Sequence, residues 1–322
     1  MSNYFGLTPQ LLSLDWGTSS LRAFLMRESN VIETRQSGHG IQHLPSSGTA
    51  GYEQAFAEIA GDWVAQWPQL PIVACGMVGS AQGWKEAPYV RCPADIQLLA
   101  SKSITVQSGL GPDILIAPGV LFDVPDALPD VMRGEEIQIA GALLTNPQWA
   151  IRSCMLLPGT HSKWAQIENG RIVRYATYLT GELFAVLSKH SILGRLMPAE
   201  GDSKSESDPA AFELGLATAR RSGPGDLSRQ IFGTRTLGLA GRLPLASLAE
   251  YLSGLLIGHE LVSGIAGAGD LTSVPLVMIG APSLCQRYVH SLKYMGQSAD
   301  AVLDNTAPAG LWNLAMASGR IA

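Results

Sequence analysis

The stretch LLSLDWGTSSLRAFLM, residues 11–26, is an apolar segment that breaks at Asp15 and then resumes. Its two apolar halves predict a pair of strands joined by a turn at residues 17–20. A turn alone requires neither a carboxylate at the end of the first strand nor successive hydroxyls. Glycine lets backbone N–H groups approach an anion closely, and the hydroxyls of Thr18 and Ser19 are further donors. The stretch therefore predicts a hairpin whose tip binds an anionic group such as phosphate.

A second stretch, CMLLPGTHSKWAQIENGRIV at residues 154–173, repeats this design close to half the chain length later. Both stretches hold an apolar strand, the pattern G-T-x-S-x-x-A, a second strand and a polar turn. The matching residues are Gly17, Thr18, Ser20 and Ala23 in the first and Gly159, Thr160, Ser162 and Ala165 in the second. Such a repeat predicts two similar α/β domains. We place them at residues 1–145 and 146–322, with the last helix, 307–319, packing back on their junction.

The composition is that of an ordinary globular protein, with 322 residues, 46% hydrophobic and 15% charged. The net charge of −5, without blocks of like charge, argues against binding to nucleic acid or to an anionic membrane surface. The cysteines are scattered, which argues against a zinc site and a disulfide framework. No apolar run reaches the ~20 residues of a membrane span, and no signal peptide is recognisable. We expect a cytoplasmic protein.

Strand and helix patterns alternate along the chain, which is typical of an α/β fold. Predicted strands lie at 11–27, 31–36, 71–79, 153–179 with turns between them, and 274–280. Predicted helices lie at 52–67, 133–144, 283–296 and 307–319, with mostly helical pattern from 181 onward. Residues 82–129 indicate mixed strand and loop, and residues 201–209 a polar loop.

Two hairpin tips, one from each domain, can hold the phosphates of one nucleotide between them. The chain has neither the GxxxxGK[ST] of a P-loop nor the GxGxxG of a dinucleotide-binding fold. Asp15 beside hydroxyls suits magnesium bound through water, because magnesium keeps much of its hydration shell. Ordinary turns are also rich in glycine, threonine and serine. The duplication favours the phosphate interpretation.

Further motifs make the resemblance specific. LDWGTSSLR (14–22) and LPGTHSKW (157–164) resemble the two phosphate motifs of the sugar-kinase, heat-shock-chaperone and actin superfamily, and the stretch from 274 to 296 resembles its adenosine motif. Together with GMVGSAQGWKEAPY (76–89), PDVMRGEEIQIAGAL (129–143) and TYLTGELFAVLSKHSILG (177–194), they identify the chain as a member of the 2-dehydro-3-deoxygalactonokinase family. The resemblance implies two facing ribonuclease-H-like domains with a central nucleotide cleft.

The resemblance also implies ATP and Mg²⁺ as cofactors and phosphorylation of 2-dehydro-3-deoxy-D-galactonate at its terminal hydroxyl. Small-molecule sugar acid and ATP are then the partners, and a homodimer stays open. Pro158 stands where the wider superfamily often has Asp or Gly, which argues against a metal ligand on the second loop. The residues expected to bind ATP are Gly17, Thr18, Ser19, Gly159, Thr160, His161 and Lys163 at the phosphates and Gly280 and Ala281 at the adenosine. His161 and Lys163 have an equally ordinary alternative as surface residues.

Glu135 is our candidate for the base that takes the proton of the attacking hydroxyl. It follows Gly134 at a predicted helix start, where related sugar kinases carry an aspartate after glycine. Glu136 and Asp130 are alternatives, but adjacent helical residues point ~100° apart, so Glu135 and Glu136 cannot both face one site. Acidic residues in a first helical turn also stabilise the helix dipole without any catalytic role.

A planar carboxylate on the substrate suits a guanidinium, which can hold it with two hydrogen bonds. The candidate residues for the sugar acid are Arg22, Ser80, Gln82, Trp84, Arg133 and Glu182, with Thr180 weaker. Each has a structural alternative: Arg22 can brace Asp15, Arg133 can be a surface residue, and the glycine-flanked loop at 79–83 can be a plain turn.

Three other functions compete with this one. A kinase of another sugar or sugar acid would share the same phosphate motifs. A sugar-responsive regulator on this scaffold would carry a DNA-binding segment before the first hairpin, and we expect none because that hairpin begins near residue 11. An ATPase of the actin type would hydrolyse ATP without any sugar acid.

Overall fold

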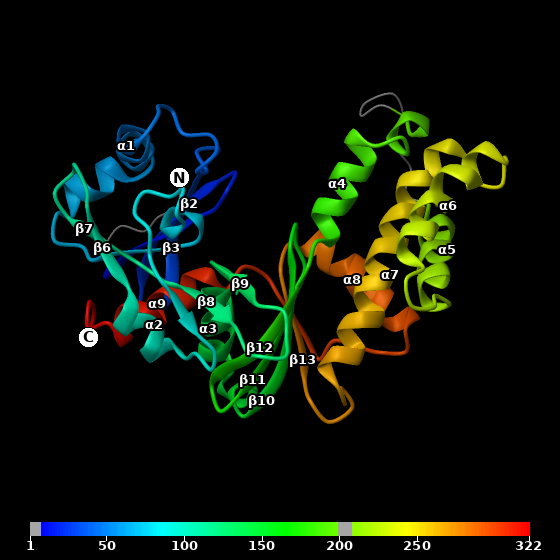
Figure 1. The fold of residues 1–322 in the computed structure, drawn as a ribbon. Helices are drawn as coiled ribbons and strands as arrows, with labels where there is room; N and C mark the ends of the chain where they lie inside the picture. The colour runs from blue at the N-terminus through cyan, green and yellow to red at the C-terminus, as the bar shows by residue number, and fades with distance from the viewer. Residues whose placement is uncertain (1–7, 199–207) are drawn as a thin grey trace. The chain divides into compact units, whose positions relative to one another are not determined.

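The computed structural model describes residues 8–198 and 208–322, which form two compact units (Figure 1). Unit 1 comprises Met1–Ser153, Ala165–Tyr175 and Asn305–Ala322, and unit 2 comprises Cys154–Trp164 and Ala176–Asp304. The units therefore differ from the continuous halves 1–145 and 146–322. The C-terminal helix belongs to unit 1, because it packs against the helices and strands of that unit.

Unit 1 is built on two sheets. The larger has the order β3-β2-β1-β4-β7-β6, and the smaller has the order β5-β8-β9. The strands are β1 Leu11–Trp16, β2 Leu21–Arg27, β3 Asn30–Ser37, β4 Ile72–Cys75, β5 Tyr89–Arg91, β6 Ile104–Gln107, β7 Asp113–Ile116, β8 Gly119–Phe122 and β9 Asp130–Met132. The helices are α1 Thr49–Gln66, α2 Ile96–Lys102, α3 Glu135–Thr145 and α9 Ala307–Ala317, with short 3₁₀ turns η1 Met77–Gly79 and η2 Pro147–Ala150.

Unit 2 combines a set of helices with strands of a third sheet. This sheet has the order β12-β11-β10-β13-β14, and its segment Ala165–Tyr175, which covers most of β11 and β12, is assigned to unit 1. The strands are β10 Arg152–Leu157, β11 Ser162–Glu168, β12 Arg171–Tyr178, β13 Leu276–Ile279 and β14 Ala301–Leu303. The helices are α4 Thr180–His190, α5 Pro209–Arg220, α6 Leu227–Leu239, α7 Leu248–Ala268 and α8 Pro282–Tyr294, with 3₁₀ turns η3 Gly194–Leu196 and η4 Leu245–Ser247. Helix α7 contacts each of the other four helices of this set (Figure 1).

The two larger sheets share one order of strands, which agrees with the predicted duplication. In each, three consecutive strands lie side by side, and the first of them pairs in parallel with a strand that comes later in the chain. Strand β1 is parallel to β4, and β4 to β7; strand β10 is parallel to β13, and β13 to β14. In both sheets the first strand is thus central, and its carboxyl end leads into the glycine-threonine turn.

Packing on both faces explains why β1 reads as an almost unbroken apolar run. Every residue of β1 is buried. Leu12, Leu14 and Trp16 pack toward a core that includes Phe56 and Trp63 of α1. Helix α9 also packs on β1, so a central strand covered on both sides needs no polar alternation.

One predicted strand is shorter than expected. The sequence predicted a strand over 71–79, but β4 ends at Cys75 and η1 follows. Gly76 has a φ of 91°, which ends the extended backbone, and a Cβ at this position would lie 2.8 Å from the carbonyl oxygen of Trp16. Most of the predicted polar loop at 201–209 lies outside the described residues.

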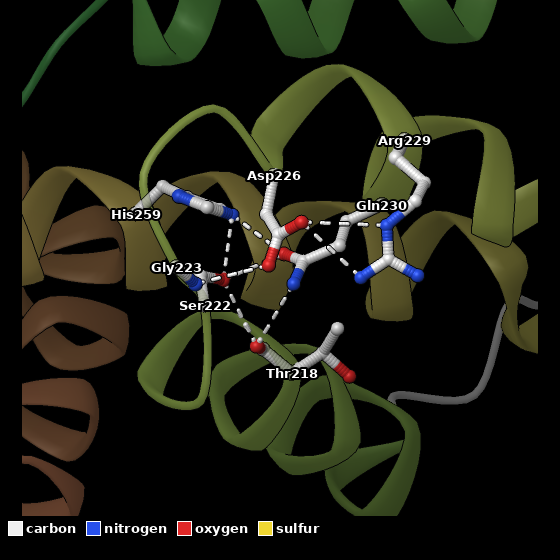
Figure 2. Close-up of polar contacts among 7 residues, drawn as sticks. All are labelled: Thr218, Ser222, Gly223, Asp226, Arg229, Gln230 and His259. Atoms are coloured by element: carbon white, nitrogen blue, oxygen red, sulfur yellow. Dashed lines mark hydrogen bonds and ion pairs between the residues drawn. The ribbon is translucent and has the colours of Figure 1, made fainter.

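A polar cluster ties the turn between α5 and α6 to helix α7 (Figure 2). His259 Nε2 lies 2.7 Å from Oε1 of Gln230, and Ser222 Oγ donates to the same oxygen at 2.8 Å. Asp226 accepts from the backbone N–H of Gly223 instead of from the histidine. Ser222 Oγ also lies 3.1 Å from Thr218 O and 3.4 Å from His259 Nε2, so the Ser222 hydroxyl links α5 with α6 and α7 (Figure 2). Asp226 does not orient the histidine by a hydrogen bond, as the acid of a catalytic triad would, so the cluster has a structural arrangement.

Two glycines allow α3 and α9 of unit 1 to touch through their backbones. A Cβ at Gly310 would overlap the carbonyl oxygen of Ile137, and a Cβ at Gly141 would overlap that of Thr306. Thr306 also donates from Oγ1 to the carbonyl oxygen of Gln138 at 2.6 Å. This contact holds the C-terminal helix in unit 1.

We predict that Gly310→Ala destabilises unit 1 by about 2–3 kcal/mol. The added methyl group would clash with the backbone carbonyl of Ile137, which cannot move aside as a flexible side chain can. Urea unfolding followed by circular dichroism measures the change. Gly61→Ala in α1 is the control: its Cβ meets only a leucine methyl at 3.9 Å, so we expect no loss and up to ~1 kcal/mol gain in helix propensity. Equal stability of the Gly310 variant and the wild type would contradict the prediction.

Candidate active site

The first hairpin tip is braced by a neighbouring loop. Gly17 N donates to Ser20 O at 2.9 Å, which closes the turn. Ile41 N and Gln42 N donate to the carbonyl oxygens of Gly17 and Thr18, each at 3.1 Å. The Thr18 and Ser19 side chains are exposed. The tip is therefore fixed from behind while its hydroxyls face solvent, as a phosphate-binding turn requires.

Asp15 lies at the carboxyl end of β1, opposite Arg22 on β2. Arg22 Nη2 is 2.7 Å from Asp15 Oδ2, which confirms that Arg22 braces this carboxylate. The two form a close ion pair, and Arg22 Nε is buried without a hydrogen-bond partner among the described residues. Burial raises the pKa of Asp15, Arg22 opposes this, and the charge of Glu135 adds to it.

The start of α3 lies beside the ends of β1 and β4. A Cβ at Gly134, whose φ is 109°, would lie 3.4 Å from the Cα of Gly76. The half-buried Glu135 accepts from the backbone N–H of Arg133 at 3.2 Å, and its charge acts on Asp15. Glu135 therefore shares a site with the predicted magnesium residue. The third candidate base, Asp130, lies on β9, where its carbonyl oxygen accepts from Tyr175.

Glu136 has a different environment from its neighbour. Its side chain is fully buried, and both carboxylate oxygens accept from the backbone N–H of Gly134, at 2.9 and 2.7 Å. Burial and the nearby charge of Glu135 raise its pKa to about 8. A side chain that caps its own helix start in this way has a structural role.

Arg133 and Ser80 present buried polar atoms without partners. Arg133 is 9% exposed, donates from Nη2 to Ala87 O at 2.8 Å, and lies with its guanidinium 4.4 Å from the ring centre of Tyr89. Its Nε and Nη1, and Oγ of Ser80, have no hydrogen-bond partner among the described residues. A Cβ at Gly79 would lie 3.0 Å from Nη1, so the guanidinium adjoins the loop that carries Ser80. Such a buried, unpaired cation is costly unless an anion binds it.

Gln82 and Trp84 line a pocket of about 640 Å³ in unit 1, together with the loop before α1 and Tyr52. Trp84 stacks on Tyr52 with ring centres 5.8 Å apart and contacts Trp16 edge-on at 5.8 Å. The Tyr52 hydroxyl donates to the carbonyl oxygen of Gln82 at 2.8 Å. Trp84 is thus a rigid wall, and the exposed Gln82 side chain is accessible to a ligand.

The second hairpin tip lies in unit 2 and adjoins the start of α4. Glu182 N donates to the carbonyl oxygen of Thr160 at 3.0 Å, and the Glu182 carboxylate pairs with His161. Lys163 is buried, not solvated, and its Nζ donates to His161 O at 3.0 Å. Glu182, expected at the sugar acid, therefore contacts the phosphate hairpin of unit 2.

A pocket of about 580 Å³ opens beside this tip, within unit 2. Gly159 and Thr160 line it on one side and Ala281 on another. Gly280 donates its N–H to Leu303 O at 3.0 Å, which fixes the turn after β13. The pocket lies between the predicted phosphate tip and the predicted adenosine turn, as a nucleotide site requires.

Sequence reasoning missed several residues of this pocket. Arg287 of α8 donates from Nη2 to Glu250 at 2.8 Å and to Ser253 at 2.9 Å, and all three line it. Sequence reasoning also missed Glu260, which does not line the pocket and is buried on the mostly apolar helix α7. A charged residue in an apolar helix is the signal that could have revealed a buried polar network.

Within residues 8–198 and 208–322, no group of three or more His, Cys, Asp or Glu side chains could hold a metal ion. Across the same described ranges, every helix is too short or too polar to cross a lipid bilayer.

Comparison with known proteins agrees with these features. A model of the family described as 2-keto-3-deoxy-galactonokinase matches residues 15–314. The chain is 35% identical over 312 residues to 2-dehydro-3-deoxygalactonokinase of Escherichia coli strain K12, covering 97% of this chain and 99% of that protein. A crystal structure from Sinorhizobium meliloti, described as a 2-dehydro-3-deoxygalactonokinase, has a TM-score of 0.82 and 32% identity over 95% of this chain and 98% of that chain.

A more distant structure extends the similarity of fold. The activator of the 2-hydroxyisocaproyl-CoA dehydratase from Clostridium difficile, solved with ADPNP, has a TM-score of 0.51 and 12% identity. Each chain is covered over 96% of its length. The predicted α/β fold of the sugar-kinase and actin type is confirmed.

We predict that Glu136→Gln weakens the pH dependence of stability. Because the pKa of Glu136 is raised from 4.5 to about 8, the folded chain keeps a proton that the unfolded chain loses, so stability falls as pH rises from about 4.5 to 8. The amide stays neutral and still accepts from Gly134. Urea unfolding at pH 5 and pH 8.5 should show a smaller loss than in the wild type.

The control for this prediction is Glu86→Gln, which changes an exposed glutamate and should keep the wild-type pH dependence. The same loss of stability in Glu136→Gln as in the wild type would show that the carboxyl is ionised in the folded chain.

Proposed function

The chain belongs to the 2-keto-3-deoxy-galactonokinase family, and we propose that it phosphorylates 2-dehydro-3-deoxy-D-galactonate at its 6-hydroxyl with ATP, giving the 6-phosphate and ADP. The name of the Escherichia coli relative supports this substrate. The structural observation that carries the proposal is the buried guanidinium of Arg133 with two unpaired nitrogens. A sugar acid supplies the anion that this cation lacks, and a neutral hexose does not.

The nucleotide binds in the pocket of unit 2 that opens beside the second hairpin. The adenosine lies against Ala281 and the start of α8, and the phosphates reach Thr160. In unit 1 the hydroxyls of Thr18 and Ser19 are the further donors to phosphate. Backbone and hydroxyl donors of this kind bind a triphosphate without adding the charge of a lysine.

Magnesium fits Asp15 through water. Asp15 lies at the carboxyl end of β1, next to the turn with the exposed Thr18 and Ser19, and its carboxylate can accept from a metal-bound water. Magnesium that stays partly hydrated and bound to nucleotide phosphates needs few protein ligands. When bound, the metal neutralises charge on the phosphates.

Glu135 takes the proton of the 6-hydroxyl. It is half-buried and near Asp15, whereas Glu136 is buried and already bound to Gly134. Positioning of the hydroxyl and removal of its proton are the main tasks left to the protein in such a transfer. The Arg22 guanidinium balances the charge of Asp15 beside this base.

The sugar acid binds with its carboxylate at Arg133 and Ser80. Nη1 of Arg133 and the Ser80 hydroxyl, which are both buried without a partner, are the donors to this carboxylate. The Tyr89 ring and the Ala87 carbonyl hold the guanidinium in place. Gln82 and Trp84 line the adjoining pocket for the rest of the sugar.

A coupled assay of ADP release tests the proposed reaction. The panel comprises 2-keto-3-deoxy acids of different stereochemistry and neutral hexoses, each with and without magnesium. Release that depends on 2-dehydro-3-deoxy-D-galactonate supports the proposal. Release without any acceptor, or only with a hexose, would assign the chain to another activity.

We predict that Glu135→Gln lowers kcat by about 10²–10⁴, because an amide cannot accept the proton. KM for both substrates should change little. Glu136→Gln and Asp130→Asn are matched variants and should lose far less. A Glu135→Gln loss well below tenfold would remove Glu135 from the role of base, and a large loss in one of the others would identify the base.

We predict that Arg133→Met raises KM for the sugar acid about 10- to 100-fold, as expected for the loss of hydrogen bonds to a charged group, and leaves KM for ATP near the wild-type value. The preference for a sugar acid over a neutral hexose should fall with it. Arg91→Met, which removes an exposed arginine paired with Asp123, is the control. An unchanged preference would place the carboxylate elsewhere.

A further inference from the structure

Glu260 accepts hydrogen bonds from three different elements of unit 2. Trp164 of β11 donates from Nε1 to Oε1 at 3.0 Å. Tyr288 of α8 donates from its hydroxyl to Oε2 at 2.6 Å, and Thr180 at the start of α4 donates to the same oxygen. The carboxylate is 2% exposed, so these protein donors replace its water.

The network continues from Glu260 to the second phosphate hairpin. Ser162 Oγ lies 3.1 Å from the Tyr288 hydroxyl, and Gly159 N donates to Ser162 Oγ at 3.3 Å. Tyr288 gives its one hydroxyl proton to Glu260, and Ser162 also interacts by hydrogen bonding with the Glu260 carboxylate. Ser162 therefore links Gly159 to Glu260, both directly and beside Tyr288.

A second branch reaches the same hairpin through α4. Thr180, bound to Glu260, precedes Gly181, where a Cβ would lie 2.6 Å from the carbonyl oxygen of Gly159. Glu182 N then donates to Thr160 O at 3.0 Å. One buried carboxylate thus holds both the hairpin and the helix start that touches it.

We propose that Glu260 is a positioning residue that holds the Gly159–Thr160 turn and the start of α4 in the geometry that binds the phosphates of ATP. The inference rests on the proposed function, because it takes the adjoining pocket as the nucleotide site. Glu260 is absent from the residues that line that pocket, whereas Gly159, Thr160 and Thr180 line it. Its effect is therefore transmitted through the side chains that bind it.

A polar acceptor is needed at this position, and only a carboxylate satisfies all the donors. The indole N–H of Trp164 can only donate, and the Tyr288 hydroxyl donates to Glu260 as well. An amide in place of the carboxylate would direct N–H groups at one of these donors. Glu260→Gln should therefore disturb the network although it conserves size.

The test measures binding of a non-hydrolysable ATP analogue with magnesium by calorimetry and, separately, KM for ATP and for the sugar acid. Ser162→Ala cuts the link between Glu260 and Gly159 without touching the pocket. We expect it to raise the Kd of the analogue and KM for ATP about three- to tenfold, the effect of one lost hydrogen bond, with KM for the sugar acid unchanged. Glu260→Gln should have at least this effect.

Ser291→Ala is the matched control. Ser291 is also a fully buried serine, lies on the same helix as Tyr288, and donates only to Arg287 O of its own helix at 2.7 Å. It should bind the analogue as the wild type does. Thermal unfolding of all variants separates loss of fold from loss of binding, and Ser162→Ala keeps the inference testable if Glu260→Gln does not fold.

Two results would overturn the inference in different ways. Wild-type affinity and KM in Ser162→Ala, with the wild type binding the analogue, would refute the positioning role and leave the proposed function intact. No binding of the analogue by the wild type would refute the nucleotide site and the inference together.

Discussion

The close contact at Gly76 is the constraint on which the site in unit 1 depends. Its missing side chain lets the chain turn beside the carbonyl oxygen of Trp16 and lets Gly134 approach from the other side. The ends of β1 and β4 and the start of α3 can then lie together. This brings Asp15, at the end of an apolar strand, within the electrostatic range of Glu135, which is distant in the sequence.

Asp15, Glu135 and Glu136 lie close enough in unit 1 for their charges to interact, and the structure compensates these charges in different ways. Arg22 pairs with Asp15, and Glu136 avoids the problem because burial raises its pKa to about 8. Arg133 is itself left with unpaired nitrogens in a buried position. Burying a polar group without a hydrogen-bond partner costs free energy. Such unsatisfied groups are therefore concentrated at sites where a ligand can supply the partner. These unpaired atoms are the observation on which the proposed sugar-acid site rests.

In unit 2 the main structural requirement is different: the irregular turn after β10 must be held in one conformation. Its turn at Gly159 and Thr160 has little bulk of its own, and the surrounding helices supply rigidity through Glu260 and its donors. The Arg287 and Glu250 pair also lines this pocket. Networks of this kind fix geometry when their polar groups are satisfied, and here the carboxylate of Glu260 accepts from Trp164, Thr180 and Tyr288.

The sequence by itself determined the duplicated hairpins, the α/β class and the family, because apolar periodicity and glycine-threonine turns are local patterns. It also indicated Asp15 with Arg22, since residues across a hairpin follow from the register. Only the tertiary structure decided that the C-terminal helix belongs to unit 1, that Lys163 is buried, that Glu136 caps its own helix, and that Glu260 gathers Ser162, Trp164, Thr180 and Tyr288. These facts depend on contacts between residues far apart in the chain, and burial, which sets their charge and their hydrogen bonds, exists only once those residues are packed.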